Sequence, residues 1–163
     1  MFDQLGITVA RVDFVDPAVA GEPDARERGV RIEVRPVTTT VAGTIYASDA
    51  RALEPAICRV DFLESGPGRA DRMHWHPDMT DGEPGGRTFD TEMPPDPVGW
   101  LTGFLHDLGT FLAGKDVTAT PEDLEAVQAT TQEIAAAVEG GLAWARSPWP
   151  DVVHDERGMA VVR

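Results

Sequence analysis

Hydrophobic and polar residues alternate along several segments in the first half of the chain. Residues 30–35 alternate strictly between apolar and charged side chains, which is the period of a strand with one buried face. Residues 6–15 and 37–46 are rich in β-branched residues, and we expect both to be strands. The charged residues 20–29 contain glycine and proline, and they predict a loop before the strand at 30–35.

A β-hairpin is predicted in the middle of the chain. Residues 57–64 alternate again, a turn rich in glycine and proline follows, and residues 71–76 return as an antiparallel partner. Residues 48–53, before this hairpin, predict one helical turn. After it, the proline, glycine and acidic residues of 77–97 predict a long loop, in which residues 88–90 form a short strand.

The period of the apolar residues changes to three and four after residue 97, as in an amphipathic helix. Asp96 is placed to cap this helix, and Gly114 is a suitable end for it. Thr120 is a good N-cap for a second amphipathic helix. We expect the second helix to end before Ser147, where two prolines follow.

Strands followed by helices indicate an α+β fold. We expect a mainly antiparallel sheet from the N-terminal half, covered by two C-terminal amphipathic helices. The 163 residues, of which 42% are hydrophobic, suit one domain with one core. We therefore expect a single domain over residues 1–163, made of a strand-rich part (1–76), a loop rich in proline, glycine and acidic residues (77–97), a helical part (98–146) and a tail (147–163).

The chain is strongly acidic, with 28 acidic and 14 basic residues and a formal net charge of -14. Such a surface repels phosphate groups, so we expect neither nucleic acid nor a membrane as a partner. No apolar stretch approaches the ~20 residues that cross a bilayer. The single cysteine, Cys58, cannot form an intramolecular disulfide, and charged residues interrupt the N-terminal stretch where a signal peptide needs an apolar run. These features favour a cytoplasmic protein.

Two histidines at strand spacing point to a metal site. His74 and His76 lie in the returning strand of the predicted hairpin, so both imidazoles point to the same face of the sheet. If the apolar residues of the two hairpin strands share the buried face, Asp61 must share the opposite face with the histidines. Asp81 and Glu83 follow in the loop and are further candidate carboxylate ligands. Two histidines and a carboxylate form a ligand set that binds iron, zinc or manganese.

The residues around these histidines resemble the first motif of the cupin family. Residues 68–76 contain a glycine, five further residues and then His-x-His, like the opening of that motif, whose two histidines bind a metal inside a small β-barrel. The family's motif continues with a glutamate four or five residues later, where this sequence has Asp81, with Glu83 beyond it. The family's second motif is absent, and the chain becomes helical after residue 97. The resemblance is therefore confined to a metal-chelating strand and does not extend to the barrel.

The pattern predicts a small metal-binding protein, and more specifically a mononuclear metal-dependent enzyme that acts on a small molecule through this His-x-His strand. Arg72, on the same predicted face as the histidines, would hold an anionic group of that molecule, and the loop at 77–97 would close over the site. No glycine-rich stretch precedes a helix N-terminus, so we expect no nucleotide cofactor. The residues indicate metal ligands without choosing a reaction, and they leave open whether the protein is an enzyme.

Three other interpretations stay open. In the first, the histidines are ordinary half-exposed strand residues, and Asp61 is their cross-strand ion-pair partner. In the second, the protein is a non-catalytic binding or interaction module that forms a homo-oligomer, most simply a homodimer, through its helices or a sheet edge. Trp100, Phe104 and Phe111 favour the second, because they make the first helix apolar over a wider arc than one buried face needs. The last of the three is a metal-free enzyme or ligand carrier that uses a pocket between the sheet and the helices, for which the sequence offers no specific residue.

Overall fold

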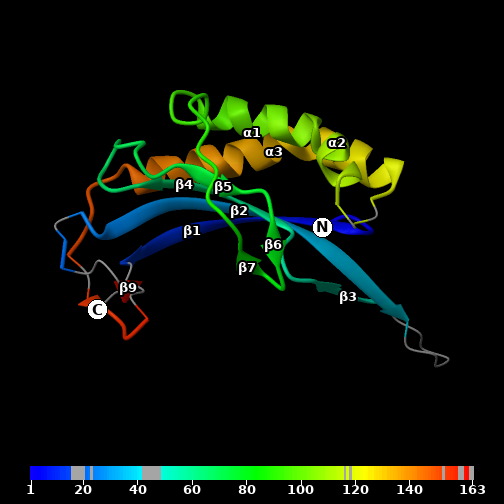
Figure 1. Cartoon of the computed structure of the whole chain (residues 1–163), viewed down its shortest axis with the longest axis horizontal. Helices are drawn as coiled ribbons and strands as arrows, with labels where there is room; N and C mark the ends of the chain where they lie inside the picture. Colours follow the sequence, from blue (N-terminus) through cyan, green and yellow to red (C-terminus); the bar gives the residue numbers. More distant parts are fainter. Residues whose placement is uncertain are drawn as a thin grey trace.

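The fold is an antiparallel sheet with helices packed on one of its faces (Figure 1). The computed structural model describes the chain over residues 1–15, 21–22, 24–41, 49–115, 117, 119–151, 153–157 and 160–161. The sheet comes from the N-terminal half and the helices from the C-terminal half, so the predicted α+β class is confirmed. Over these ranges, no helix is both long enough and apolar enough to cross a membrane.

The main strands lie side by side in the order β1 (Leu5–Val15), β2 (Arg26–Val41), β4 (Cys58–Glu64) and β5 (His74–His76). A further strand, β3 (Asp49–Leu53), pairs with the last residues of β2. All of these pairs are antiparallel. The hairpin formed by β4 and β5 is the one that the alternating pattern predicts, although β5 is shorter than expected.

Separate strands are predicted on either side of Pro36, but Pro36 does not divide the strand in which it lies. β2 passes through Pro36, so the segments predicted at 30–35 and 37–46 form one strand, and residues 42–46 lie outside the described residues. The carbonyl of Pro36 accepts a hydrogen bond from the backbone N–H of Glu54. The proline nitrogen faces the same side of β2. It lies at the point where the strand paired with β2 on that side changes from β4 to β3. A missing N–H is tolerated there because no ladder hydrogen bond depends on it.

Two local predictions near the sheet are wrong. Residues 26–29, assigned to a loop, are the first residues of β2 and pair with a neighbouring strand. Residues 49–53, assigned to a helical turn, form β3 and pair with the end of β2, while residue 48 lies outside the described residues. In both cases pairing with another strand outweighs the local preference of the chain. All of β3 is exposed, so no buried face marks it in the sequence.

The helices follow the sheet in chain order as α1 (Pro97–His106), α2 (Leu108–Ala113) and α3 (Pro121–Ala145). Both predicted caps are present. Asp96 accepts a hydrogen bond from the backbone N–H of Gly99, and Thr120 forms a capping box with Asp123. The first predicted helix is divided at Asp107, which ends α1 and precedes α2.

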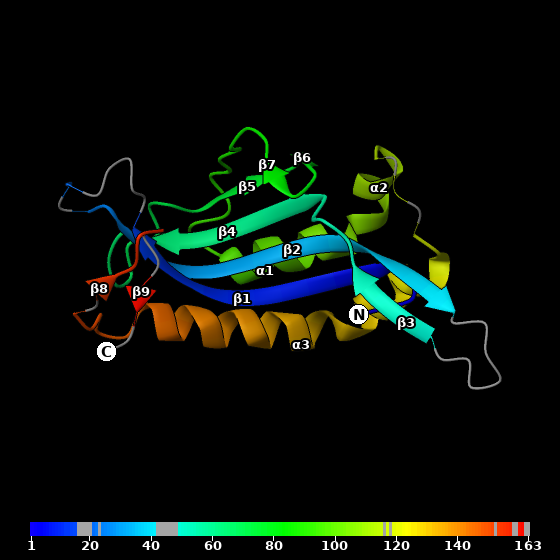
Figure 2. The ribbon, with the colours of Figure 1, turned by 90° about the horizontal axis from the view of Figure 1, so that it is seen from below.

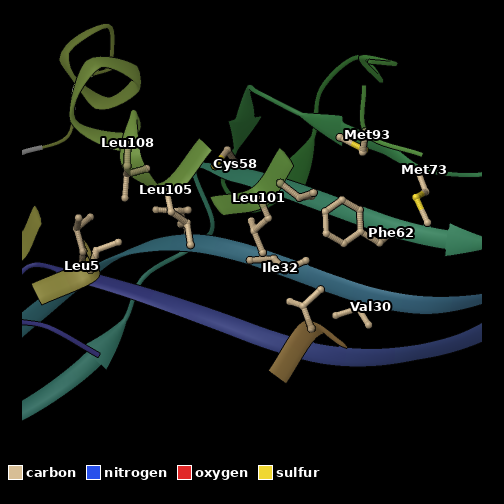
Figure 3. Packing of buried hydrophobic residues seen from close by; sticks show 14 of the residues in the cluster. Leu5, Val30, Ile32, Cys58, Phe62, Met73, Met93, Leu101, Leu105 and Leu108 are labelled. Carbon is tan, nitrogen blue, oxygen red and sulfur yellow. The ribbon is translucent and has the colours of Figure 1, made fainter. Parts of the chain in front are cut away.

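One face of the sheet and the inner sides of the helices form the hydrophobic core (Figure 3). Its buried members include Val30, Ile32, Val34, Cys58, Val60, Phe62, Leu101, Leu105 and Leu108. Helix α3 approaches β2 closely at Gly141, where an added Cβ would lie 2.4 Å from Cγ2 of Val30. The helix continues through Gly141 to Ala145. The absence of a side chain at Gly141 allows the close packing of α3 against β2.

The opposite face of the sheet carries charged residues and faces away from α1 and α3 (Figure 2). On this side lies a short hairpin next to β5 (Figure 1), formed by β6 (Met79–Thr80) and β7 (Glu83–Pro84). A second short hairpin, formed by β8 (Val153–His154) and β9 (Ala160–Val161), lies near the C-terminus. The predicted long loop at 77–97 thus contains regular structure of its own next to the polar face.

Asp123 ties the N-terminus of the chain to the start of α3. Its buried carboxylate accepts hydrogen bonds from the backbone N–H groups of Asp3 and Gln4 at 2.8 and 3.2 Å. The backbone N–H and the hydroxyl of Thr120 donate to the same carboxylate at 3.2 and 2.9 Å. Burial alone would raise the pKa of Asp123, but these hydrogen bonds favour the ionised form and lower that pKa below its ordinary value.

We expect Asp123→Asn to lower the free energy of unfolding at neutral pH by about 2 kcal/mol, because an amide carries no charge and cannot accept all four hydrogen bonds. A carboxyl whose pKa is lowered by folding stabilises the protein above its unfolded-state pKa of ~3.9, and this stabilisation is lost as the pH falls through the folded-state pKa. The variant should therefore lose less stability than the wild type below about pH 4.

Urea unfolding across this pH range measures both effects. Asp96→Asn is the matched control, because asparagine keeps the N-cap of α1 and the stability should change little. Equal losses in the two variants would contradict the role given to Asp123.

Candidate metal centre

Asp61, His74 and His76 come together on the polar face of the sheet. Asp61 lies on β4 directly opposite His74 on β5, and Arg59 lies opposite His76. The shared face that the alternating pattern predicts for these residues is confirmed by this register. One ligand atom from each of Asp61, His74 and His76 lies within 4.8 Å of the others. In this group the Nε2 atoms of His74 and His76 lie 3.6 and 3.9 Å from Oδ2 of Asp61.

All three residues of this group are buried, although they lie on the face that the helices do not cover. Asp61 is 0% exposed, and His74 and His76 are each 3% exposed. The interpretation of the histidines as half-exposed strand residues is therefore wrong. The chain after β7 covers them, since the carbonyl of Gly85 meets His76 and the ring of Phe89 lies 5.8 Å from the ring of His74.

The backbone fixes the orientation of both imidazoles. Nδ1 of His74 lies 2.9 Å from the carbonyl oxygen of Arg72, and Nδ1 of His76 lies 2.9 Å from that of Gly85. A carbonyl oxygen only accepts hydrogen bonds, so each Nδ1 carries a hydrogen and donates it. In the neutral ring, each Nε2 then presents its lone pair to Asp61. Burial lowers the pKa of His74, which favours this neutral form.

Two arginines pair with the carboxylate of Asp61. Nε of Arg31 lies 2.7 Å from one carboxylate oxygen, and Nε of Arg59 lies 2.8 Å from the other. Arg59 also places Nη2 3.3 Å from Nε2 of His76, where it can donate a hydrogen bond. His74 has no such donor: among the described residues, none forms a hydrogen bond to its Nε2. The alternating pattern gives no sign of these contacts of Arg59 and Arg31.

The remaining predicted site residues lie elsewhere. Asp81 and Glu83 are exposed in the hairpin of β6 and β7, where Asp81 has a φ of 52° in the turn, and neither belongs to the buried group. The side chain of Arg72 pairs with Asp24 at 2.9 Å. Its carbonyl orients His74. A role of the Arg72 side chain in holding a substrate stays a prediction.

The chain matches no protein-family model, no curated protein and no solved structure. Its function is therefore inferred from the side chains of the buried group. Two imidazoles and one carboxylate form a set that can hold a metal ion. Hydrogen bonds from the second nitrogen of each histidine to a carbonyl are the usual support of such ligands in metalloproteins.

We expect Asp61→Asn to lower the free energy of unfolding of the metal-free protein by about 3 kcal/mol, because it leaves the two arginines without their buried counter-charge. Asp3→Asn is the control, since Asp3 forms an exposed ion pair with Arg51, which contributes less than about 1 kcal/mol. Urea unfolding in the presence of a chelator measures both. Similar losses in the two variants would show that the ion pairs of Asp61 contribute no more than a surface pair.

Proposed function

We propose that the protein binds one divalent transition-metal ion through Nε2 of His74, Nε2 of His76 and the carboxylate of Asp61. The observation that carries this proposal is the orientation of the two rings. Both Nδ1 atoms donate to backbone carbonyls, so two lone pairs converge on one carboxylate oxygen inside the protein. Iron, zinc and manganese are the metals that suit two imidazoles and a carboxylate.

The contact between His74 and Asp61 supports a bound cation over a purely structural network. A neutral imidazole nitrogen and a carboxylate oxygen are both acceptors, so they gain little from facing each other at 3.6 Å. A proton or a metal ion between them makes the contact favourable. Burial lowers the pKa of His74 and so disfavours the proton. A metal ion is the partner that fits both observations, because metal ligands must be unprotonated.

Three protein ligands leave coordination positions for water or a small molecule, which is the ligand count of catalytic sites more than of structural ones. A metal so held supplies a Lewis acid that can activate water or polarise a carbonyl. We therefore propose, more specifically, that the protein is a mononuclear metal-dependent enzyme that acts on a small molecule. Arg31 and Arg59 lie beside the carboxylate and are available to face an anionic group of that molecule.

Metal content tests the proposal. Tag-free protein purified without chelator and then loaded with iron, zinc or manganese should retain close to one equivalent, measured by inductively coupled plasma mass spectrometry. The His74→Ala/His76→Ala double variant should lose the metal while its circular dichroism spectrum shows a folded protein. His106→Ala removes an exposed histidine and should retain the metal. Metal-free wild-type protein after loading would overturn the proposal.

We expect Arg59→Leu to bind the metal about tenfold more tightly than the wild type, because Arg59 donates to the same Nε2 of His76 that the metal needs. Arg35→Leu is the matched control, since Arg35 lies on the same face of the sheet but pairs with Glu33. Its affinity should equal that of the wild type. Competition with a chromophoric chelator measures both affinities, and weaker binding by Arg59→Leu would show that Arg59 orients Asp61 and does not compete.

A further inference from the structure

The other side of β5 borders a cavity of about 830 Å³ between the sheet edge, α1 and the loop before α1. Four half-buried aromatic rings line it: Trp75, Trp100, Phe104 and Phe111. Trp75 lies 5.7 to 5.9 Å from each of the other three rings. Trp100 and Phe104 are stacked within 9° of parallel. Trp100, Phe104 and Phe111 are the residues that make the predicted first helix apolar over a wide arc, so they serve this cavity as well as the core.

The rest of the lining includes four acidic residues. Asp90, Glu92, Asp96 and Asp107 border the cavity, and its lining includes no lysine, arginine or histidine. The indole N–H of Trp100 donates to Asp90 at 2.9 Å, which joins the acidic rim to the aromatic wall. Among the described residues, Glu92 and Asp107 have no ion-pair or hydrogen-bond partner for their carboxylates. The cavity therefore combines aromatic rings with carboxylates that no basic residue of its lining neutralises.

This combination selects an organic cation. The face of an aromatic ring attracts a cation, most strongly one that is poorly hydrated, such as an alkylated ammonium group. The carboxylates repel an anionic ligand. They do not gather as metal ligands do, because the described side chains that bring three ligand atoms together are Asp61, His74 and His76. The volume lies within the ~300–1,000 Å³ that small-molecule sites occupy and exceeds what one ammonium head fills.

We infer that this cavity binds a small organic cation that has a methylated ammonium head and an apolar body. The head lies against the rings of Trp75, Trp100 and Phe104, near the carboxylates of Glu92 and Asp107. The apolar body fills the remaining aromatic part of the cavity. This site is separate from the proposed metal centre, and the inference does not depend on a bound metal.

Charge also distinguishes this occupant from a second copy of the chain. The protein carries a formal net charge of -14, and the cavity concentrates four carboxylates at its border. Two copies that meet at this face would bring these carboxylates together, which is unfavourable. A cation relieves that repulsion, whereas dimerisation through the wide face of α1 increases it.

Isothermal titration calorimetry with benzyltrimethylammonium tests the inference, and benzyl alcohol serves as the neutral probe of similar aromatic body. The wild type should bind the cation, and binding of the neutral probe should be about tenfold weaker or more. Glu92→Gln/Asp107→Asn should weaken binding of the cation several-fold. No binding of the cation, or equal binding of the two probes, would overturn the inference.

A blocking variant locates the site. Gly103 lines the cavity, lies in α1, and an added Cβ there would meet nothing within 4 Å, so the side chain of Gly103→Leu should occupy the part of the cavity beside Trp100 and Phe104 without disturbing the fold. It should abolish binding. Gly140→Leu is the matched control, because Gly140 is another helical glycine with open space around its Cβ and does not line the cavity. Unchanged binding in Gly103→Leu would overturn the inference, as would a dimer that Gly103→Leu converts to a monomer.

The His74→Ala/His76→Ala variant separates this inference from the proposed metal site. Its affinity for benzyltrimethylammonium should equal that of the wild type, even though it should lose the metal. Loss of cation binding together with the metal, in a folded variant, would mean that the cation is held at the metal centre and would overturn the assignment to the aromatic cavity.

Discussion

The alternation of side chains across β4 and β5 is the constraint on which the rest of the molecule depends. Phe62 and Trp75 point toward the helices, while Asp61, His74 and His76 point the other way. A slip by one residue would exchange the two sets and place ionisable groups in the apolar core. Because an unpaired buried charge costs several kcal/mol, both faces of the sheet hold the same register. The geometry of the group formed by Asp61, His74 and His76 is thus a consequence of how the core packs.

The acidic residues on the two sides of β5 differ in whether basic residues pair with them. On the polar face, Arg31 and Arg59 both pair with Asp61, so the buried carboxylate has its counter-charges within the protein. On the helix side, the acidic residues beside Trp100 have no basic neighbour in the cavity lining. The first site therefore contains basic partners of its own, and the lining of the second contains none. Under the two proposals, a metal ion at the first site would compete with Arg59, whereas an organic cation at the second would meet no basic residue of the lining.

The sequence was sufficient to predict the shared face of Asp61, His74 and His76, because a strand offers only two faces and the apolar residues occupy one. It could not predict that the histidines are buried, because the cover comes from Gly85 and Phe89 in a loop with no periodicity. The contact of Arg31 with Asp61 depends on the pairing of β2 with β4, which joins distant parts of the chain. Strand β3 was missed for a related reason: it is exposed on both faces, so only its partner identifies it.

The pairing of Trp75 with Thr88 has a further consequence. Their backbone groups exchange two hydrogen bonds, of 3.0 and 2.8 Å, along the outer side of β5. An uncovered outer strand offers its N–H and C=O groups to any other extended chain and promotes aggregation. The segment that shields the histidines is thus also the one that keeps this border of the sheet from recruiting a foreign strand. Substitutions that loosen this segment would cause aggregation at high protein concentration before they changed the packing of the core.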